Sequence, residues 1–127
     1  MKITAMFPFL DDESKEELVE KLISGEKSTA DFSLPSLYPF LRKEHLKKIV
    51  EAILEKKIKA SLYPILPFLD QETLEKVMEE VQSGKHEHIR SEAILPFMGK
   101  DKIRELFKKM MAKESPKEEE PTTEEES

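Results

Sequence analysis

A short motif, an apolar residue followed by Pro-Phe and then Leu or Met, recurs four times in this chain of 127 residues, with the prolines at positions 8, 39, 67 and 96. The spacings between successive prolines are therefore 31, 28 and 29 residues. A nearly fixed period of this length is typical of proteins built from tandem copies of one structural unit. The motif thus predicts four similar repeats.

The apolar residues that follow each motif keep the same register. In the second, third and fourth copies, apolar side chains stand 7, 10, 11 and 14 residues after the proline, which is the spacing of one face of an α-helix. The first copy has Lys15 at one of these positions, as expected for an end repeat with one side open to water. Each copy is predicted to contain an amphipathic helix with the apolar positions Leu18, Val19 and Leu22; Leu46, Ile49, Val50 and Ile53; Leu74, Val77, Met78 and Val81; and Ile103, Leu106, Phe107 and Met110.

Residues with strong preferences for helix ends flank these stretches. Asp11 and Asp70 lie three residues after their prolines, where an aspartate accepts hydrogen bonds from the first amides of a helix. Gly25 and Gly84 each follow their proline by 17 residues, where a glycine ends a helix well. Proline pushes the preceding residue out of the helical region, so each later motif proline is expected to mark a break between a shorter helix before it and the longer helix after it. These shorter helices are predicted at roughly 34–40, 57–66 and 87–95.

The sequence predicts an all-α fold, since no stretch alternates apolar and polar residues as a half-buried strand does. A helix pair of this size buries its apolar face only by stacking on its neighbours, so either a short α-solenoid or a compact helical bundle is expected. The predicted domain spans residues 1–112 and contains the repeats 1–33, 34–61, 62–90 and 91–112.

These motifs and amphipathic stretches resemble those of short bacterial proteins with tandem "hPFL" helix-pair repeats, which look like shortened relatives of HEAT repeats. The resemblance covers residues 5–112. It implies a helical array that contacts other macromolecules, and it brings no catalytic residue with it.

The acidic charge is concentrated near the C-terminal end. Of the formal net charge of -6, residues 113–127 carry -5, from seven glutamates against Lys113 and Lys117. This segment has two prolines and no large apolar side chain, so it is predicted to be a disordered acidic tail. The rest of the chain is almost neutral, which argues against a generally basic nucleic-acid binder.

Several other classes of protein are disfavoured by what the sequence contains. There is no cysteine for a disulfide or a thiolate metal site, no signal-peptide pattern at the N-terminus and no apolar run as long as a membrane span. We therefore expect a cytoplasmic protein that has no contact with a membrane.

No arrangement of residues predicts catalysis, a metal site or a cofactor. His45, His86 and His88 are interpreted as surface histidines, because the i, i+2 spacing of the last two does not match a helical zinc pair. The three glycines are isolated and form no phosphate-binding loop. We predict a protein that is not an enzyme, with no catalytic, metal-binding or cofactor-binding residue.

The phenylalanines of the four motifs, Phe9, Phe40, Phe68 and Phe97, allow two interpretations. They could line a peptide-binding groove, but we expect them to pack in the core as wedges between successive repeats. Tyrosine has a polar tip and methionine adapts to varied partners, and the fourth repeat has no successor to cover it. The predicted contact surface therefore consists of Tyr38, Tyr63, Phe107, Met110 and Met111.

Charge alternates in sign from repeat to repeat. The first repeat holds eight acids and four bases, whereas the second holds seven bases and three acids. The basic side chains of the second repeat are either a docking patch for a polyanion or a face complementary to the neighbouring repeats. The candidate patch consists of Arg42, Lys43, Lys47, Lys48, Lys56, Lys57 and Lys59.

The leading hypothesis is a non-enzymatic scaffold or adaptor that binds another protein, with self-association through the C-terminal repeat as a further possibility. The alternative is a small regulator that binds nucleic acid or another polyanion through the basic second repeat. The two differ in their response to salt, because nucleic-acid binding weakens steeply through counterion release.

Overall fold

The computed structural model describes the backbone of residues 1–114 and the side chains of these residues apart from 31, 113 and 114. Within this part the chain is helical and contains no strand, which confirms the all-α prediction. The predicted disordered acidic tail lies outside the described residues, except for its first two positions.

Each of the four α-helices follows one of the Pro-Phe motifs. They are α1 (Asp12–Ser24), α2 (Lys43–Leu54), α3 (Gln71–Gln82) and α4 (Lys100–Glu114). Short 3₁₀ segments precede or connect them: η1 (Ile3–Phe9), η2 (Thr29–Asp31), η3 (Leu34–Ser36), η4 (Tyr38–Phe40), η5 (Tyr63–Phe68), η6 (Ser91–Ala93) and η7 (Leu95–Phe97). The order of elements along the chain therefore follows the order of the sequence motifs.

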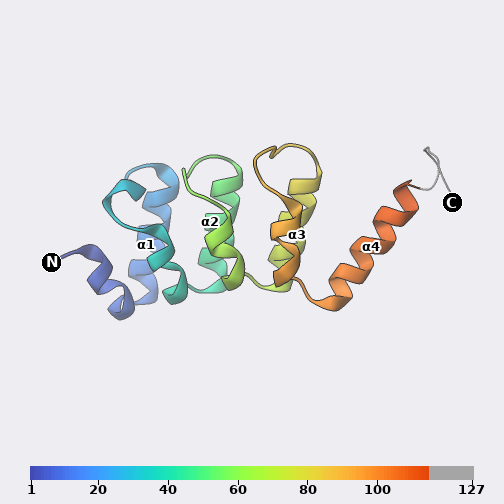
Figure 1. Cartoon of the computed structure of the whole chain (residues 1–127). Coiled ribbons are helices and arrows are strands. Elements are labelled where there is room, and N and C mark those ends of the chain that lie inside the picture. The colour runs from blue at the N-terminus through green and yellow to red at the C-terminus, as the bar shows by residue number, and fades with distance from the viewer. Residues whose placement is uncertain (115–127) are drawn as a thin grey trace. The chain divides into compact units, whose positions relative to one another are not determined.

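The chain forms two compact units, which we call the N-terminal unit (Met1–Phe97) and the C-terminal unit (Met98–Ser127, described to residue 114). In the N-terminal unit, α1, α2 and α3 lie side by side in chain order, and the chain turns back after each of them at the same end (Figure 1). The Pro-Phe segments lie at the other end, where the α-helices begin. The C-terminal unit contains α4.

The core of the N-terminal unit is made by the predicted apolar faces. Val19, Ile49 and Val77 are each at most 1% exposed, and the other predicted apolar positions of α1, α2 and α3 are also buried. Residues three and four apart share one face of an α-helix, so one buried stripe per helix was expected. The predicted register of these three helices is confirmed.

The ends of the helices are fixed as the sequence predicts. Asp11 and Asp70 each accept a hydrogen bond from the backbone amide three residues later, at 2.8 Å. Gly25 and Gly84 take left-handed backbone conformations just after α1 and α3, with φ of 88° and 90°. The equivalent position after α2 is Lys56, which takes the same conformation with φ of 65°.

The predicted shorter helices are confirmed only in part. They are broken into one- or two-turn 3₁₀ segments, and the region 57–62 is not helical. Proline lacks an amide hydrogen, so the closely spaced Pro35 and Pro39, and Pro64 and Pro67, prevent an α-helical ladder from propagating. Each motif proline lies inside its 3₁₀ segment, and in the first three copies the break before the α-helix comes two residues later, at an extended leucine.

Candidate protein-interaction surface

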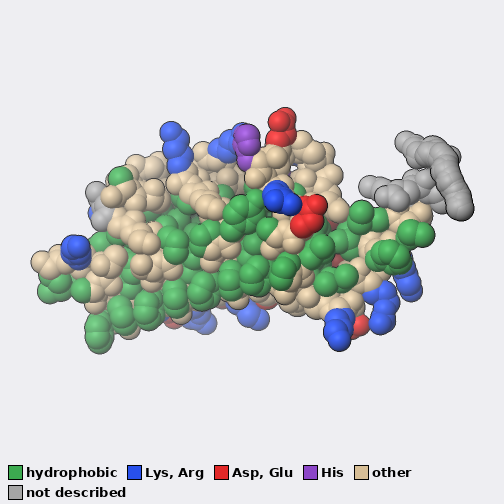
Figure 2. Space-filling view, viewed as in Figure 1, with side chains coloured by type: hydrophobic (Ala, Val, Ile, Leu, Met, Phe, Trp, Pro, Cys, Tyr) green, Lys and Arg blue, Asp and Glu red, His purple; other side chains and the backbone are tan. Residues whose placement is uncertain are grey.

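The four motif phenylalanines are solvent-exposed, so the predicted core packing is wrong. Phe9 is 85% exposed, Phe40 36%, Phe68 41% and Phe97 38%. The prolines before them are exposed as well. We call these four aromatic side chains the phenylalanine row. Figure 2 shows hydrophobic side chains gathered in a band along the side of the N-terminal unit where the Pro-Phe segments lie.

The 3₁₀ geometry explains why phenylalanine faces outward. A 3₁₀ helix has three residues per turn, so residues three apart lie on the same face. In the second motif these are Tyr38, which is buried, and Leu41, which is half-buried, whereas Phe40 falls between them and points away. The same holds in the third motif for Leu66 and Leu69, both buried. Within the motif the apolar residues that face the core are three residues apart, and this period of 3.0 rather than 3.6 would have predicted that the phenylalanines are exposed.

Tyr38 is buried, and its assignment to an exposed contact surface is wrong. It is 1% exposed, and its ring packs against that of Phe68 with 6.1 Å between centroids. Its hydroxyl has no hydrogen-bond partner among the described residues, and burial raises its pKa to about 12. Tyr38 therefore supports a member of the phenylalanine row from within the core.

Tyr63 is 38% exposed, and its hydroxyl joins two segments of the chain. The hydroxyl donates a hydrogen bond to the carbonyl oxygen of His88 at 3.3 Å and accepts one from the amide of Arg90 at 3.1 Å. Its polar tip is therefore already engaged within the N-terminal unit.

The members of the predicted basic patch have different neighbours. Arg42 pairs with Asp12 of α1, and Lys48 pairs with Glu16 at 3.4 Å and with Glu20 at 2.9 Å. The hydrogen bond with Glu20 is the main reason why the pKa of Lys48 is raised. These pairs support the interpretation that charge on the second repeat complements the first.

Of the remaining basic side chains, two lie near the start of α3 and three lie in the loop after α2. A side-chain hydrogen bond with Thr73 is the main cause of the lowered pKa of Asp70; the backbone amide of Thr73 and the nearby Lys43 and Lys47 lower it further. Lys57 pairs with Glu55 at 3.2 Å. Lys56 and Lys59 are exposed in the loop.

His45 is buried and His86 is half-buried, so the prediction of three surface histidines is wrong for His45 and only partly right for His86. His45 is 5% exposed, and its Nδ1 accepts a hydrogen bond from the amide of Arg42 at the start of α2. The side chain of His86 is 9% exposed and is hydrogen-bonded to Glu80 at 3.0 Å, which lowers the pKa of that carboxyl. His88 is exposed.

Within residues 1–114, no three or more histidine, aspartate or glutamate side chains are grouped so that they would hold a metal ion. No helix in that part of the chain combines the length and hydropathy that crossing a bilayer requires. In the C-terminal unit, α4 exposes Phe107, Met110 and Met111. Comparisons with protein-family models, with curated proteins and with solved structures gave no match to this chain.

Proposed function

We propose that this protein is a non-enzymatic scaffold or adaptor, built as a short helical-repeat array, that binds a partner protein through the phenylalanine row. The observation that carries this proposal is that four motifs place a phenylalanine at the same position and leave all four exposed. Large exposed apolar patches on soluble proteins mark interaction sites more often than chance exposure does.

The energetics of the phenylalanine row suit a binding surface. Fully burying a phenylalanine side chain contributes about 1.5–3 kcal/mol relative to leaving it exposed, so four partly exposed rings leave several kcal/mol for a partner. Aromatic anchors of this kind carry much of the energy at protein interfaces. The preceding prolines restrict the backbone, so little conformational entropy is lost when the rings are covered.

The array interpretation is supported by how α1, α2 and α3 are arranged. They lie side by side in chain order, and ion pairs from Arg42 and Lys48 join α2 to α1 (Figure 1). The resemblance of the motifs to "hPFL" helix-pair repeats points in the same direction. In such an array each repeat contributes one ring to the row, so the binding surface grows with the number of repeats.

The nucleic-acid alternative has less support, because Arg42 and Lys48 are engaged with acidic residues of α1. The exposed apolar side chains of α4, led by Phe107, remain a second protein-contact candidate in the C-terminal unit. Self-association through α4 is part of this second candidate.

The experiment compares the full chain with two variants in extracts of its native cell. The first variant, Phe9→Ser with Phe40→Ser, removes two rings of the row without touching Tyr38 or Phe68. The matched control, Phe107→Ser, removes an exposed ring of α4. Circular dichroism first establishes that all three proteins are equally helical.

We expect a partner protein that co-purifies with the parent and with Phe107→Ser but is lost from the double variant. Affinity for the purified partner should change little between low and moderate salt, unlike that of a nucleic-acid complex. A partner that stays with the double variant, or that is lost only from Phe107→Ser, contradicts the assignment to the phenylalanine row.

A further inference from the structure

The apolar face of α4 is largely exposed to solvent. Its members are three and four residues apart and therefore share one face of the helix; we call them the α4 stripe, which consists of Ile103, Leu106, Phe107, Met110 and Met111. Phe107 is 61% exposed, Met110 43% and Met111 56%, whereas the predicted apolar positions of α1, α2 and α3 are buried. An exposed apolar stripe of this kind is typical of a helix that lies against another surface.

The charged residues of α4 are arranged in order around the α4 stripe. The helix holds six basic and three acidic residues, so its net charge is positive. With 3.6 residues per turn, basic residues follow both edges of the stripe, Lys100 and Arg104 on one and Lys102 and Lys109 on the other. Asp101 and Glu105 lie on the face opposite the stripe. Figure 2 shows hydrophobic side chains along one side of α4 and Lys or Arg side chains along its lower edge.

Any surface that covers the α4 stripe meets basic side chains on both sides of it. A second copy of α4 meets this pattern poorly, because pairing of two stripes would bring bases against bases. A surface of anionic lipids matches it, because phosphate groups surround an inserted helix on every side and long basic side chains extend to reach them. Asp101 and Glu105 would lie about 10 Å farther from the lipid, roughly one Debye length, so their repulsion is largely screened.

The length of α4 suits a helix that lies in the plane of a lipid surface. Its 15 residues span roughly 22 Å, whereas a membrane-spanning helix needs about 20 consecutive apolar residues. The expectation of no membrane contact rests on the absence of a long apolar run, and an interfacial helix does not need one. The six glutamates that follow α4 in the sequence have the opposite charge and lower the expected affinity.

We propose that α4 binds an anionic lipid surface and lies in its plane, with the α4 stripe inserted at the boundary of the acyl chains. Phe107, the most exposed member of the stripe, would enter the lipid. Lys100 and Arg104 would donate charge-assisted hydrogen bonds to lipid phosphates. The site is separate from the phenylalanine row, and the proposal does not rest on that row.

The test is flotation of the full chain with increasing amounts of lipid vesicles, made either from equal amounts of phosphatidylcholine and phosphatidylglycerol or from phosphatidylcholine alone. Phe107→Ser tests the stripe, and Lys100→Gln with Arg104→Gln tests one of its edges. The matched control is Lys56→Gln with Lys59→Gln, which changes the net charge equally through two exposed lysines of the N-terminal unit. A second control, Phe9→Ser with Phe40→Ser, alters the phenylalanine row. Circular dichroism first establishes that all variants are as helical as the parent.

We expect the parent to bind the mixed vesicles more tightly than the neutral ones. Each base near an anionic surface changes affinity about fivefold, so the Lys100 and Arg104 variant should bind the mixed vesicles at least about tenfold more weakly. Phe107→Ser should weaken binding by about tenfold, and both controls should leave it nearly unchanged.

Three results overturn the proposal. The first is that the parent does not bind the mixed vesicles, which would leave α4 to protein contacts, or that it binds both kinds of vesicle equally. The second is an equal loss of binding in the Lys56 and Lys59 control, because binding would then follow net charge alone. The third is binding that survives Phe107→Ser but is lost in the Phe9 and Phe40 variant, because the phenylalanine row would then be the lipid-binding surface.

Discussion

Replacing Lys56 with glycine should stabilise the protein, although it removes a side chain. For an L-residue the left-handed conformation costs about 1–2 kcal/mol, whereas glycine adopts it freely. Against this gain stands the greater entropy of glycine in the unfolded chain, about 0.5–1 kcal/mol. The ammonium group of Lys56 is exposed, so its removal contributes little either way. The expected net effect is an increase of about 0.5–1 kcal/mol in the free energy of unfolding.

The reverse substitution provides a matched test at the equivalent position after α3. An added Cβ at Gly84 would have no atom within 4 Å, so Gly84→Ala would meet no steric clash. Its whole effect therefore comes from the backbone conformation, with φ of 90°. We expect Gly84→Ala to destabilise the protein by about 1 kcal/mol.

Urea unfolding followed by far-ultraviolet circular dichroism measures both effects, with equal m-values as the sign that the unfolded state is unchanged. Lys59→Gly serves as the control, because Lys59 does not have a positive φ and glycine there should lower stability. If Lys56→Gly is destabilising to the same degree as Lys59→Gly, then Lys56 is not held in a strained conformation.

Two further predictions concern the third repeat and the core. Side-chain and backbone hydrogen bonds with Thr73 lower the pKa of Asp70 below the usual 3.8, so the stabilising effect of Asp70 should be present above pH 3.8 and lost as the pH falls through the lowered value. Asp70→Ala should lower the free energy of unfolding by about 0.5–2 kcal/mol at neutral pH, whereas Asp70→Asn should keep the cap without the pH dependence. Urea unfolding at neutral and acidic pH tests this. Equal losses of stability in the two variants would argue against the cap. Tyr38→Phe should leave stability unchanged or raise it by up to about 1 kcal/mol, because the removed hydroxyl is buried without a partner. Since the pKa of Tyr38 is raised to about 12, the parent should also lose stability as the pH rises above 10, and this alkaline loss should be smaller in Tyr38→Phe.

The α-helices and their caps could be predicted from the sequence because local signals determine them. The period of the apolar residues gave the buried face of α2 and α3, and Asp11, Asp70, Gly25 and Gly84 marked helix ends. Lys56 could not be predicted as a helix end of the same kind, because lysine has no preference for a left-handed conformation. The left-handed conformation at Lys56 is set by α2 and its neighbours and not by a preference of lysine.

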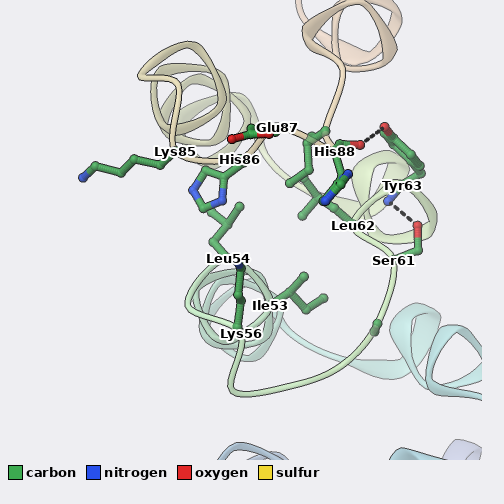
Figure 3. A pocket seen from close by; sticks show the side chains of 12 residues that line it. Ile53, Leu54, Lys56, Ser61, Leu62, Tyr63, Lys85, His86, Glu87 and His88 are labelled. Carbon is green, nitrogen blue, oxygen red and sulfur yellow. Dashed lines mark hydrogen bonds between the residues drawn. The ribbon is translucent and has the colours of Figure 1, made fainter.

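The surfaces were harder to predict than the helices, because exposure depends on contacts between segments distant in the sequence. The pairing of Arg42 and Lys48 with acidic side chains follows from the placement of α1 against α2, which brings Asp12 and Glu20 within reach. The surroundings of Lys56 depend on the segment 85–89 and on the bonds of Tyr63 (Figure 3). Of the residues there, Lys56 and Tyr63 were among the binding candidates predicted from the sequence.

The Pro-Phe motif contains two kinds of position: inner positions that folding requires to be apolar, and one outer position at which folding does not require phenylalanine. The apolar residue before the proline and the leucine after the phenylalanine share the inner face of a 3₁₀ turn, so folding requires both to be apolar. The phenylalanine between them lies on the outer side, where Phe9 is 85% exposed and the other three rings are 36–41% exposed. The four motif copies are followed by different residues at other positions, as Lys15 shows, and yet phenylalanine occurs at this outer position in all four. Packing against Tyr38 accounts for part of this requirement at Phe68 but not at Phe9, whereas the partner that we propose would account for it at every copy.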